Sequence, residues 1–497
     1  MLVIILAKLI GMLRDVVLAN YFGTTNVSDA YLIAGSVPTL LFYFIGHSIS
    51  TAFLPMYNKV LHSKGEKAAQ KYANNLLTVS LLLSTVIVVV LMLLPEIVVK
   101  LFASGFDQET VQLTSKIIRQ SAVSLYLMTV VSVWTGYLQA KNNFIIPASI
   151  SLPRNLVIMA SIVCAATFDV SALGWGLLIA YIGELLLMLP FVLKKGYRYT
   201  PIVALGDEDL KETLNLVVPI ILGVGVSQIN KIVDKSVASS VTVGGVSALN
   251  YASVINNAIQ EILVTGIITI LFAKCSEMVA KGLHDQVKSK LSQTLEVMIL
   301  LLLPASVGIV LLAKPIVVCF LSRGIFDEAS VALTSGALVC YTIGLLFMAV
   351  RDTLVKVFYS YKETRITTIT ATTAIAINVG LNLLLSRWLG ISGLALATSI
   401  SSVFHCVAMY FLLRKRIGDY GSRIHLQTVA KASLAAFVMA IAIKAIQFFF
   451  AERINSSMIE LLICVGAGIV VYGIFVVVLK VPVVNDFIRK LRGIEKS

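Results

Sequence analysis

Predominantly apolar stretches of about twenty residues recur along the whole chain, and they limit its fold more than any other feature. A helix of roughly 20 residues crosses the hydrocarbon core of a bilayer, which is about 30 Å thick. The composition agrees, because 58% of residues are hydrophobic and only 13% are charged, whereas an ordinary soluble domain carries about 25% charged residues. We therefore predict an all-α protein that spans a membrane many times, and not a soluble domain.

Polar breaks divide the chain into fourteen predicted transmembrane helices. Their approximate ranges are 2–20, 29–54, 74–101, 113–139, 145–167, 171–193, 213–237, 246–273, 291–320, 331–358, 366–387, 391–413, 428–450 and 457–480. The first of these contains charged residues and has no small-residue cleavage site after a short apolar core. We expect it to be a retained helix and not a signal peptide.

The net charge of +14 would suit a nucleic-acid partner only if the basic residues formed one patch. They lie instead in alternate loops, while the intervening loops are nearly bare. The basic loops carry Lys59, Lys64, Lys67 and Lys71; Lys194, Lys195 and Arg198; Lys274, Lys281 and Lys288; Lys362 and Arg365; Arg414, Lys415, Arg416 and Arg423; and Arg489, Lys490 and Arg492. This is the positive-inside pattern. It predicts cytoplasmic basic loops, two cytoplasmic termini and no nucleic-acid partner, with the tail VNDFIRKLRGIEKS as a short amphipathic surface segment.

An internal repeat predicts the domain organisation. FDQETVQLTS at 106–115 returns as FDEASVALTS at 326–335, an offset of 220 residues. An even number of helices separates the copies, so both halves take the same orientation in the membrane, as in transporters that work by alternating access. We predict a six-helix lobe over 1–205, a second over 206–425, and two extra helices with a cytoplasmic tail over 426–497, with a central cavity between the lobes.

Charged residues inside predicted spans indicate function, because a charge at the bilayer centre costs at least about 2.5 kcal/mol. Lys8, Arg14 and His47 would give the first lobe a cationic lining, which suits a diphosphate. A structural alternative stays open, in which Arg14 pairs with Asp15 or Asp29, Lys8 snorkels to the inner surface, and His47 is a packing residue.

The second repeat offers a different chemistry. Asn378 and Asn382 are four residues apart on one helix face, and Thr398 lies on the next helix. Together with Asp234 they predict an oxygen-ligand site for a monovalent cation, most plausibly sodium, although hydrogen bonding between helices explains the same residues. Further charges with no unique partner in the sequence are Arg119, Arg154, Glu184, Glu261, Arg351 and Asp352.

No catalytic motif is visible in the sequence: it has no P-loop, nucleophile elbow, metal-ligand spacing or Gly-rich nucleotide fingerprint. We therefore predict that the protein is not an enzyme and that it has no cofactor beyond the sodium ion. Uphill transport would then draw on an ion gradient or on the membrane potential, which supplies about 2.3 kcal/mol per charge per 100 mV.

Four stretches resemble one family. They are KLIGMLRDVVLANYFGTTNVSDAYLIA at 8–34, PTLLF to TAFLPMY across 38–57, VDKSVASSVTVGGVSALNYA at 233–252, and KVFYSYKETR to GISGLALATSIS across 356–401. Together they are similar to the MurJ (MviN) lipid II flippases of the multidrug/oligosaccharidyl-lipid/polysaccharide exporter superfamily. The likeness covers about the whole chain and keeps the order of its segments.

The resemblance implies a fourteen-helix, two-lobed flippase of the bacterial cytoplasmic membrane. Its cationic cavity would accept the diphosphate-sugar head of a lipid-linked glycan while the lipid tail stays among membrane lipids. Arg14 and Asp15 fall on the family's G-x-x-R-D motif, and Asp29 falls on its D-A-[FY] motif, so both acids join the predicted substrate site with Lys8, Arg14 and His47.

Three positions depart from the family's pattern. Lys8 stands where many members have arginine, and Phe42 and Ser253 replace arginines elsewhere. The cavity is therefore expected to be less cationic, which leaves room for another lipid-linked polysaccharide as cargo. A cation-coupled drug exporter is disfavoured because cationic drugs need acids in the cavity, and a membrane scaffold would not need buried charges. The sequence names no protein partner.

Overall fold

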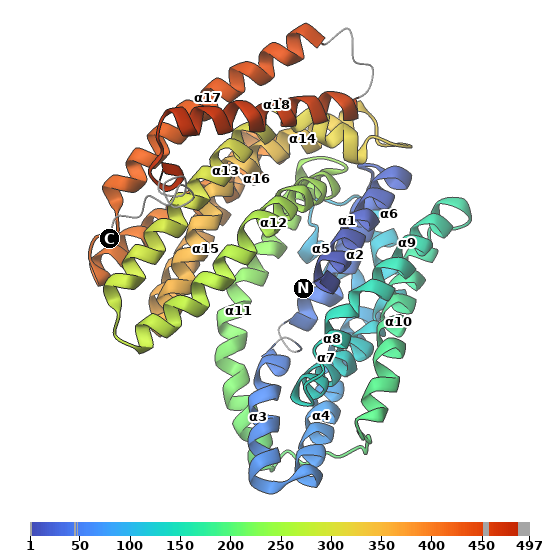
Figure 1. Cartoon of the computed structure of the whole chain (residues 1–497). Coiled ribbons are helices and arrows are strands. Elements are labelled where there is room, and N and C mark those ends of the chain that lie inside the picture. The colour runs from blue at the N-terminus through green and yellow to red at the C-terminus, as the bar shows by residue number, and fades with distance from the viewer. Residues whose placement is uncertain (1, 44–45, 47, 451–456, 486–497) are drawn as a thin grey trace. The chain divides into compact units, whose positions relative to one another are not determined.

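The computed structural model describes residues 2–43, 46, 48–450 and 457–485, and this part of the chain is helical with no strand (Figure 1). The helices are α1 (Leu2–Phe22), α2 (Asn26–Phe42), α3 (Ser48–Lys64), α4 (Glu66–Leu93), α5 (Pro95–Phe102), α6 (Gln108–Ser121), α7 (Ser124–Ala140), α8 (Ile145–Ser149), α9 (Ser151–Thr167), α10 (Ala172–Lys194), α11 (Glu208–Val241), α12 (Gly245–Ala280), α13 (His284–Leu321), α14 (Glu328–Ile343), α15 (Leu345–Ser360), α16 (Thr364–Ile417), α17 (Ser422–Phe450) and α18 (Ser457–Val478). The predicted all-α class is confirmed.

Within the described residues, eight helices are long and apolar enough to cross a membrane, or up to ten if the bent pairs α6–α7 and α14–α15 each count as one span. Helix lies in every one of the fourteen predicted ranges, but several ranges are interrupted. Pro95 begins α5, because proline lacks a backbone N–H and cannot continue the preceding helix. Gly390 has a φ of 57° inside α16, and this break falls between two predicted spans. The number fourteen itself stays a prediction.

The chain folds into two compact units. Unit 1 is Met1–Ser247 with Arg323–Asp327, and unit 2 is Ala248–Ser322 with Glu328–Ser497. The division falls near the start of α12, so α11 packs with unit 1. The predicted lobe boundaries at 205 and 425 follow the sequence repeat and not these packing contacts, so they stay predictions.

The two copies of the repeat have matching local structure. The α6–α7 pair bends by 48° and the α14–α15 pair by 45°. After α7, Asn142 has a φ of 58°, and Lys362, at the same offset of 220 residues after α15, has a φ of 61°. The Asn143 N–H bonds to the Leu138 carbonyl at 2.8 Å, and the Glu363 N–H bonds to the Phe358 carbonyl at 3.0 Å. This six-residue closure is the Schellman pattern of helix ends.

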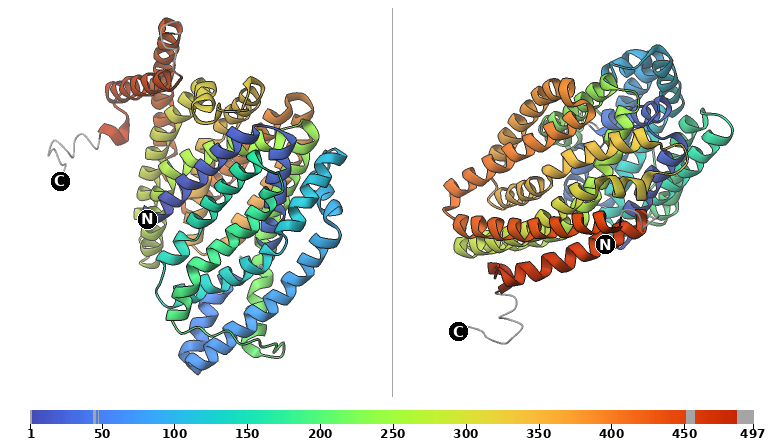
Figure 2. Two further views of the ribbon diagram at one scale, coloured as in Figure 1. Left: turned by 90° about the vertical axis from the view of Figure 1, so that its right-hand side faces the viewer. Right: turned by 90° about the horizontal axis from the view of Figure 1, so that it is seen from above.

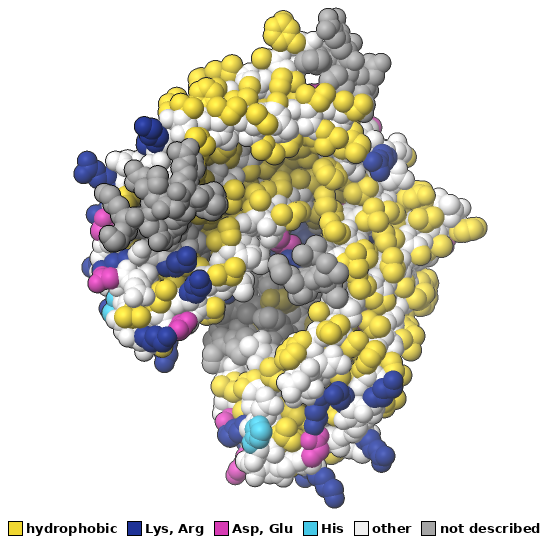
Figure 3. All heavy atoms as spheres, viewed as in Figure 1, with side chains coloured by type: hydrophobic (Ala, Val, Ile, Leu, Met, Phe, Trp, Pro, Cys, Tyr) yellow, Lys and Arg dark blue, Asp and Glu magenta, His cyan; other side chains and the backbone are white. Residues whose placement is uncertain are grey.

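Helix α10 shows how unit 1 separates its surfaces. Trp175, Ile179, Ile182 and Leu186 are exposed and recur every three or four residues, so they share one face. The buried face carries Glu184 instead. Exposed apolar side chains cover this flank of unit 1, while charged side chains gather at its end formed by α3 and α4 (Figure 3). An apolar flank with charged ends is the surface that a bilayer requires.

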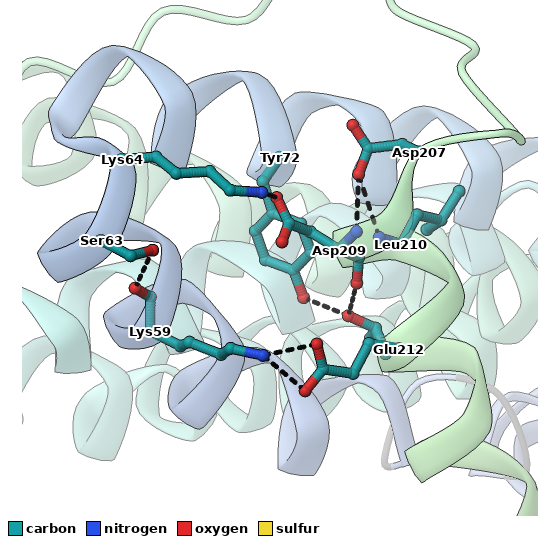
Figure 4. Close-up of polar contacts among 9 residues, drawn as sticks. Lys59, Ser63, Lys64, Tyr72, Asp207, Asp209, Leu210 and Glu212 are labelled. Atoms are coloured by element: carbon teal, nitrogen blue, oxygen red, sulfur yellow. Dashed lines mark hydrogen bonds and ion pairs between the residues drawn. The ribbon is translucent and has the colours of Figure 1, made fainter.

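The start of α11 is bound to α3 and α4 through polar contacts (Figure 4). The Asp207 carboxylate caps α11 by accepting from the Asp209 and Leu210 backbone N–H groups. Lys59 pairs with Glu212 at 2.6 Å, and Lys64 pairs with Asp209 at 2.7 Å. Two lysines of the first predicted cytoplasmic loop are therefore neutralised within unit 1.

Candidate anion-binding site

Arg14 forms the centre of a polar cluster in unit 1. Its Nε and Nη2 both donate to Asp15 Oδ1, at 3.2 and 2.8 Å, and its Nη1 donates to Asn155 Oδ1 of α9 at 3.2 Å. The Asp15 side chain is 6% exposed, whereas the Arg14 side chain is 29% exposed. A buried acid thus holds a guanidinium whose other side is open. Of the two acids named as alternative partners of Arg14, the structure pairs it with Asp15.

A second arginine, Arg154, directly precedes Asn155 of this cluster in α9. Arg154 Nη1 contacts Glu184 Oε1 of α10 at 3.0 Å, and the Glu184 side chain is only 2% exposed. Helices α9 and α10 lie side by side (Figures 1 and 2). They approach closely because Gly176 has no Cβ, which would lie 2.1 Å from the Ser161 side chain. The close packing brings the acid of one helix to the arginine of the other.

The other predicted residues of the first repeat have separate positions. Lys8 is exposed on α1. Asp29 is buried, and its Oδ1 accepts from the Ser247 backbone N–H at 2.7 Å, in the first turn of α12. His47 lies outside the described residues. The structure therefore brings Arg14 and Asp15 together and gives Asp29 a capping contact elsewhere in unit 1, so cargo contact by Lys8, Asp29 and His47 stays a prediction.

The three neutral residues of the predicted cation site meet in unit 2. Asn382 Nδ2 donates to Asn378 Oδ1 at 3.1 Å, and Asn378 Nδ2 donates to Thr398 Oγ1 at 3.4 Å. Both asparagines are buried. The kink at Gly390 folds the second half of α16 back, which places Thr398 beside Asn378.

Asp234, the fourth predicted ligand, belongs to α11 in unit 1. Its Oδ2 accepts from Asn230 Nδ2 at 3.1 Å, one helical turn away. On the same helix, Lys235 Nζ donates to the Leu32 carbonyl of α2 at 3.4 Å. The structure describes this acid within its own unit only, so its membership in a cation site stays a prediction.

Unit 2 contains an arginine–aspartate pair that the sequence left without a partner. Arg351 Nε and Nη2 donate to Asp352 Oδ1 at 3.0 and 2.8 Å, and Gln260 Nε2 of α12 donates to Asp352 Oδ2 at 3.0 Å. The only sequence signal for this pair, and for Arg154 with Glu184, was the cost of a charge inside an apolar run.

The family model of the lipid II flippase MurJ matches residues 18–465. The chain belongs to this family. A probable lipid II flippase MurJ of Thermotoga maritima is 26% identical over 97% of this chain and 96% of its own length. One of Rickettsia prowazekii is 26% identical over 94% of this chain and 93% of its own. These matches confirm the resemblance found in the sequence and place the chain among transporters and not enzymes.

Solved structures agree with the fold. A lipid II flippase MurJ in an inward closed conformation superposes with a TM-score of 0.83 at 25% identity, covering 98% of this chain and 99% of that chain. An inward-facing multidrug resistance transporter of the MATE family matches with a TM-score of 0.71 at 15% identity, covering 83% of this chain and 95% of that chain, which shows the fold alone. The chain is thus a multi-pass membrane protein of the MurJ family.

Proposed function

We propose that this protein is a lipid II flippase, which moves an undecaprenyl-diphosphate-linked peptidoglycan precursor from the inner to the outer leaflet of the bacterial cytoplasmic membrane. The observation that carries the proposal is Arg14, a guanidinium inside a predicted transmembrane helix that is held by a buried acid and remains 29% exposed. Membership of the MurJ family supports the proposal independently.

The chemistry of a diphosphate explains the need for such a residue. A diphosphate that leaves water exchanges its hydration for hydrogen-bond donors, and guanidinium presents donors in a planar fork that matches phosphate oxygens. In the described contacts Arg14 uses Nε, Nη1 and Nη2 once each, although a guanidinium carries five N–H donors. Donors therefore remain for a ligand on the open side.

The decisive test is rescue of a bacterial strain depleted of its own lipid II flippase. We expect the full chain to restore growth and to restore exposure of lipid II on the outer leaflet. A different lipid-linked polysaccharide is the second candidate cargo, because Phe42 and Ser253 replace arginines, and Ser253 Oγ only bonds the Asn250 carbonyl. That alternative would be selected by two results together. The protein would be present in the membrane without rescuing the strain depleted of its lipid II flippase, and it would rescue a strain that lacks a polysaccharide repeat-unit flippase.

The same proposal includes alternating access driven by an ion gradient or the membrane potential. We propose that sodium binds at Asn378, Asn382 and Thr398 with Asp234. The close approach of the three neutral residues, at 3.1 and 3.4 Å, supports this choice. Their amide and hydroxyl oxygens are hard ligands of the type that alkali cations accept. Asp234→Asn should remove the ion dependence of transport and leave the protein folded. If the parent protein transports equally well without sodium and without a proton gradient, the residues are structural only.

For the orientation, we propose that 56–72 and 274–290 face the cytoplasm and that 102–111 and 238–245 face outside. Contacts within unit 1 support this, because the Gly105 N–H donates to Ser239 Oγ at 3.1 Å, so these two predicted external segments lie together. Single cysteines in each loop, labelled with an impermeant reagent from outside, test it. Strong labelling near Lys64 would contradict the orientation.

A further inference from the structure

The pair formed by Arg154 and Glu184 repeats the design of the Arg14 site. In each pair the acid is nearly buried, with side-chain exposures of 2% for Glu184 and 6% for Asp15. In each pair the arginine stays partly open, with exposures of 32% for Arg154 and 29% for Arg14. In both pairs the acid is fixed inside the unit, and one side of the guanidinium is left accessible.

Both arginines belong to one neighbourhood of unit 1. Asn155, the residue after Arg154, accepts the hydrogen bond from Arg14 Nη1. The Arg154 guanidinium lies 5.9 Å from the centre of the Tyr181 ring, and Tyr181 also lies near Arg14. Tyr31 of α2 lies near both arginines. Two tyrosines therefore lie within range of both positive groups.

We propose that Arg154, held in place by Glu184, is a second guanidinium that binds the diphosphate of the cargo together with Arg14. This inference rests on the proposed function, because it assumes a lipid-linked diphosphate as the ligand. A diphosphate has two phosphate groups, and two forks in one neighbourhood match it better than one.

Glu184 acts as a positioning residue in this arrangement. Tyr181 and Glu184 are three residues apart on α10, and both contact the Arg154 guanidinium, which restricts its movement. A side chain fixed before binding loses less conformational freedom when the ligand arrives. Glu184 lies on the buried face of α10, opposite the exposed apolar face, so its charge has a function inside the unit and none toward lipid.

The test is direct binding to the purified full chain in detergent, with undecaprenyl diphosphate as the probe and native mass spectrometry as the measurement. Arg154→Gln should weaken binding on the order of tenfold, the effect of losing one charge-assisted hydrogen bond. The same substitution should weaken the binding of undecaprenyl monophosphate by a smaller factor, because a single phosphate needs only one guanidinium. The matched control is Arg119→Gln, an exposed arginine on α6 of the same unit, which should bind as the parent does.

Three comparisons decide the outcome. If Arg14→Gln weakens binding and Arg154→Gln does not, the pair is structural, and the inference fails while the proposed function stands. If the parent does not bind undecaprenyl diphosphate, both fail. If Arg154→Gln weakens binding of phosphatidylglycerol as strongly as that of the diphosphate, the residue holds a membrane-lipid headgroup, and the inference is again wrong.

Arg154→Lys keeps the ion pair with Glu184 and loses the planar fork, so it tests the inference if Arg154→Gln does not fold. We expect Arg154→Lys to melt close to the parent and to bind the diphosphate with an intermediate affinity. Parent-like affinity in this variant would overturn the inference. Glu184→Gln should weaken diphosphate binding because Arg154 is no longer held in position. Adding Arg154→Lys to this variant should not restore the binding.

Discussion

The same dipeptide, arginine followed by aspartate, forms the same chelate in both units but in different surroundings. Arg14 and Arg351 each donate from Nε and Nη2 to the following aspartate, with Nη2 distances of 2.8 Å in both. Asp15 is 6% exposed, whereas Asp352 is 39% exposed. In unit 1 a neighbouring amide oxygen binds the arginine, and in unit 2 a neighbouring amide N–H binds the acid.

The difference concerns which partner the surrounding protein fixes. Burial of Asp15 strengthens its attraction for Arg14, because the low dielectric screens the charges less. Asn155 adds a third fixed contact to the guanidinium. In unit 2 the exposed Asp352 is screened by solvent, and the bond from Gln260 orients the acid and not the arginine. We infer that Arg14 is preorganised for an anion and that Arg351 is less so.

The largest expected effect separates the two arginines by function. Arg14→Ala should insert normally and fail to support flipping, because loss of a charge-assisted hydrogen bond costs about 1.5–3 kcal/mol, a tenfold to hundredfold loss of affinity. Arg351→Ala should reduce transport by a smaller factor. Both are measured as exposure of lipid II on the outer leaflet in depleted cells, normalised to the amount of protein in the membrane.

Arg14→Lys provides the matched control for this prediction, because it keeps the charge and loses the fork. It should restore only part of the activity. The comparison breaks if Arg14→Ala flips the precursor as well as the parent, or if Arg351→Ala is the more damaging change. Absence of the Arg14→Ala protein from the membrane would instead assign Arg14 a structural role.

An intermediate effect is expected on stability when the acids are changed. Asp15→Asn leaves a partly buried arginine without its charge partner, which costs about 3 kcal/mol in comparable pairs. Asp352→Asn removes an exposed partner and should cost about 0–1 kcal/mol. Thermal melting of the two purified variants in one detergent measures the difference. Equal melting temperatures would show that burial of Asp15 does not set the strength of its pair.

The sequence offered the pairing of Arg14 with Asp15 as one interpretation, and it did not predict the contact between Arg154 and Glu184. Arg14 and Asp15 are adjacent in the sequence, so a contact between their side chains needs no information about helix packing. Arg154 and Glu184 are 30 residues apart on different helices, and their contact depends on how α9 packs against α10. Close approach at Gly176 sets that packing, and no local pattern in the sequence encodes it. Tertiary contacts between helices are therefore the part that the sequence left open.

The fold shows the same division between local and tertiary information. Hydrophobic runs predicted where helix occurs, because the bilayer fixes the length and polarity of a span. They did not predict the bends of α6–α7 and α14–α15, each of which lies inside a single predicted span. The break at Gly390 was predicted because polar residues surround it, although the positive φ was not.

The smallest expected effect comes from the exposed ion pairs of unit 1, which show the opposite extreme to Asp15. Lys59 and Glu212 are 54% and 46% exposed, although their charged atoms are only 2.6 Å apart. Exposed pairs of this kind contribute about 0.2–1 kcal/mol, and that contribution is screened by salt. A double-mutant cycle of Lys59→Gln and Glu212→Gln should therefore give a coupling energy below about 1 kcal/mol that disappears near 1 M salt. Rescue of the depleted strain should be unchanged by either substitution. A larger or salt-independent coupling energy would mean that a short distance is enough for a strong ion pair in this protein, without burial of the acid. The stability losses from Asp15→Asn and Asp352→Asn would then have no reason to differ.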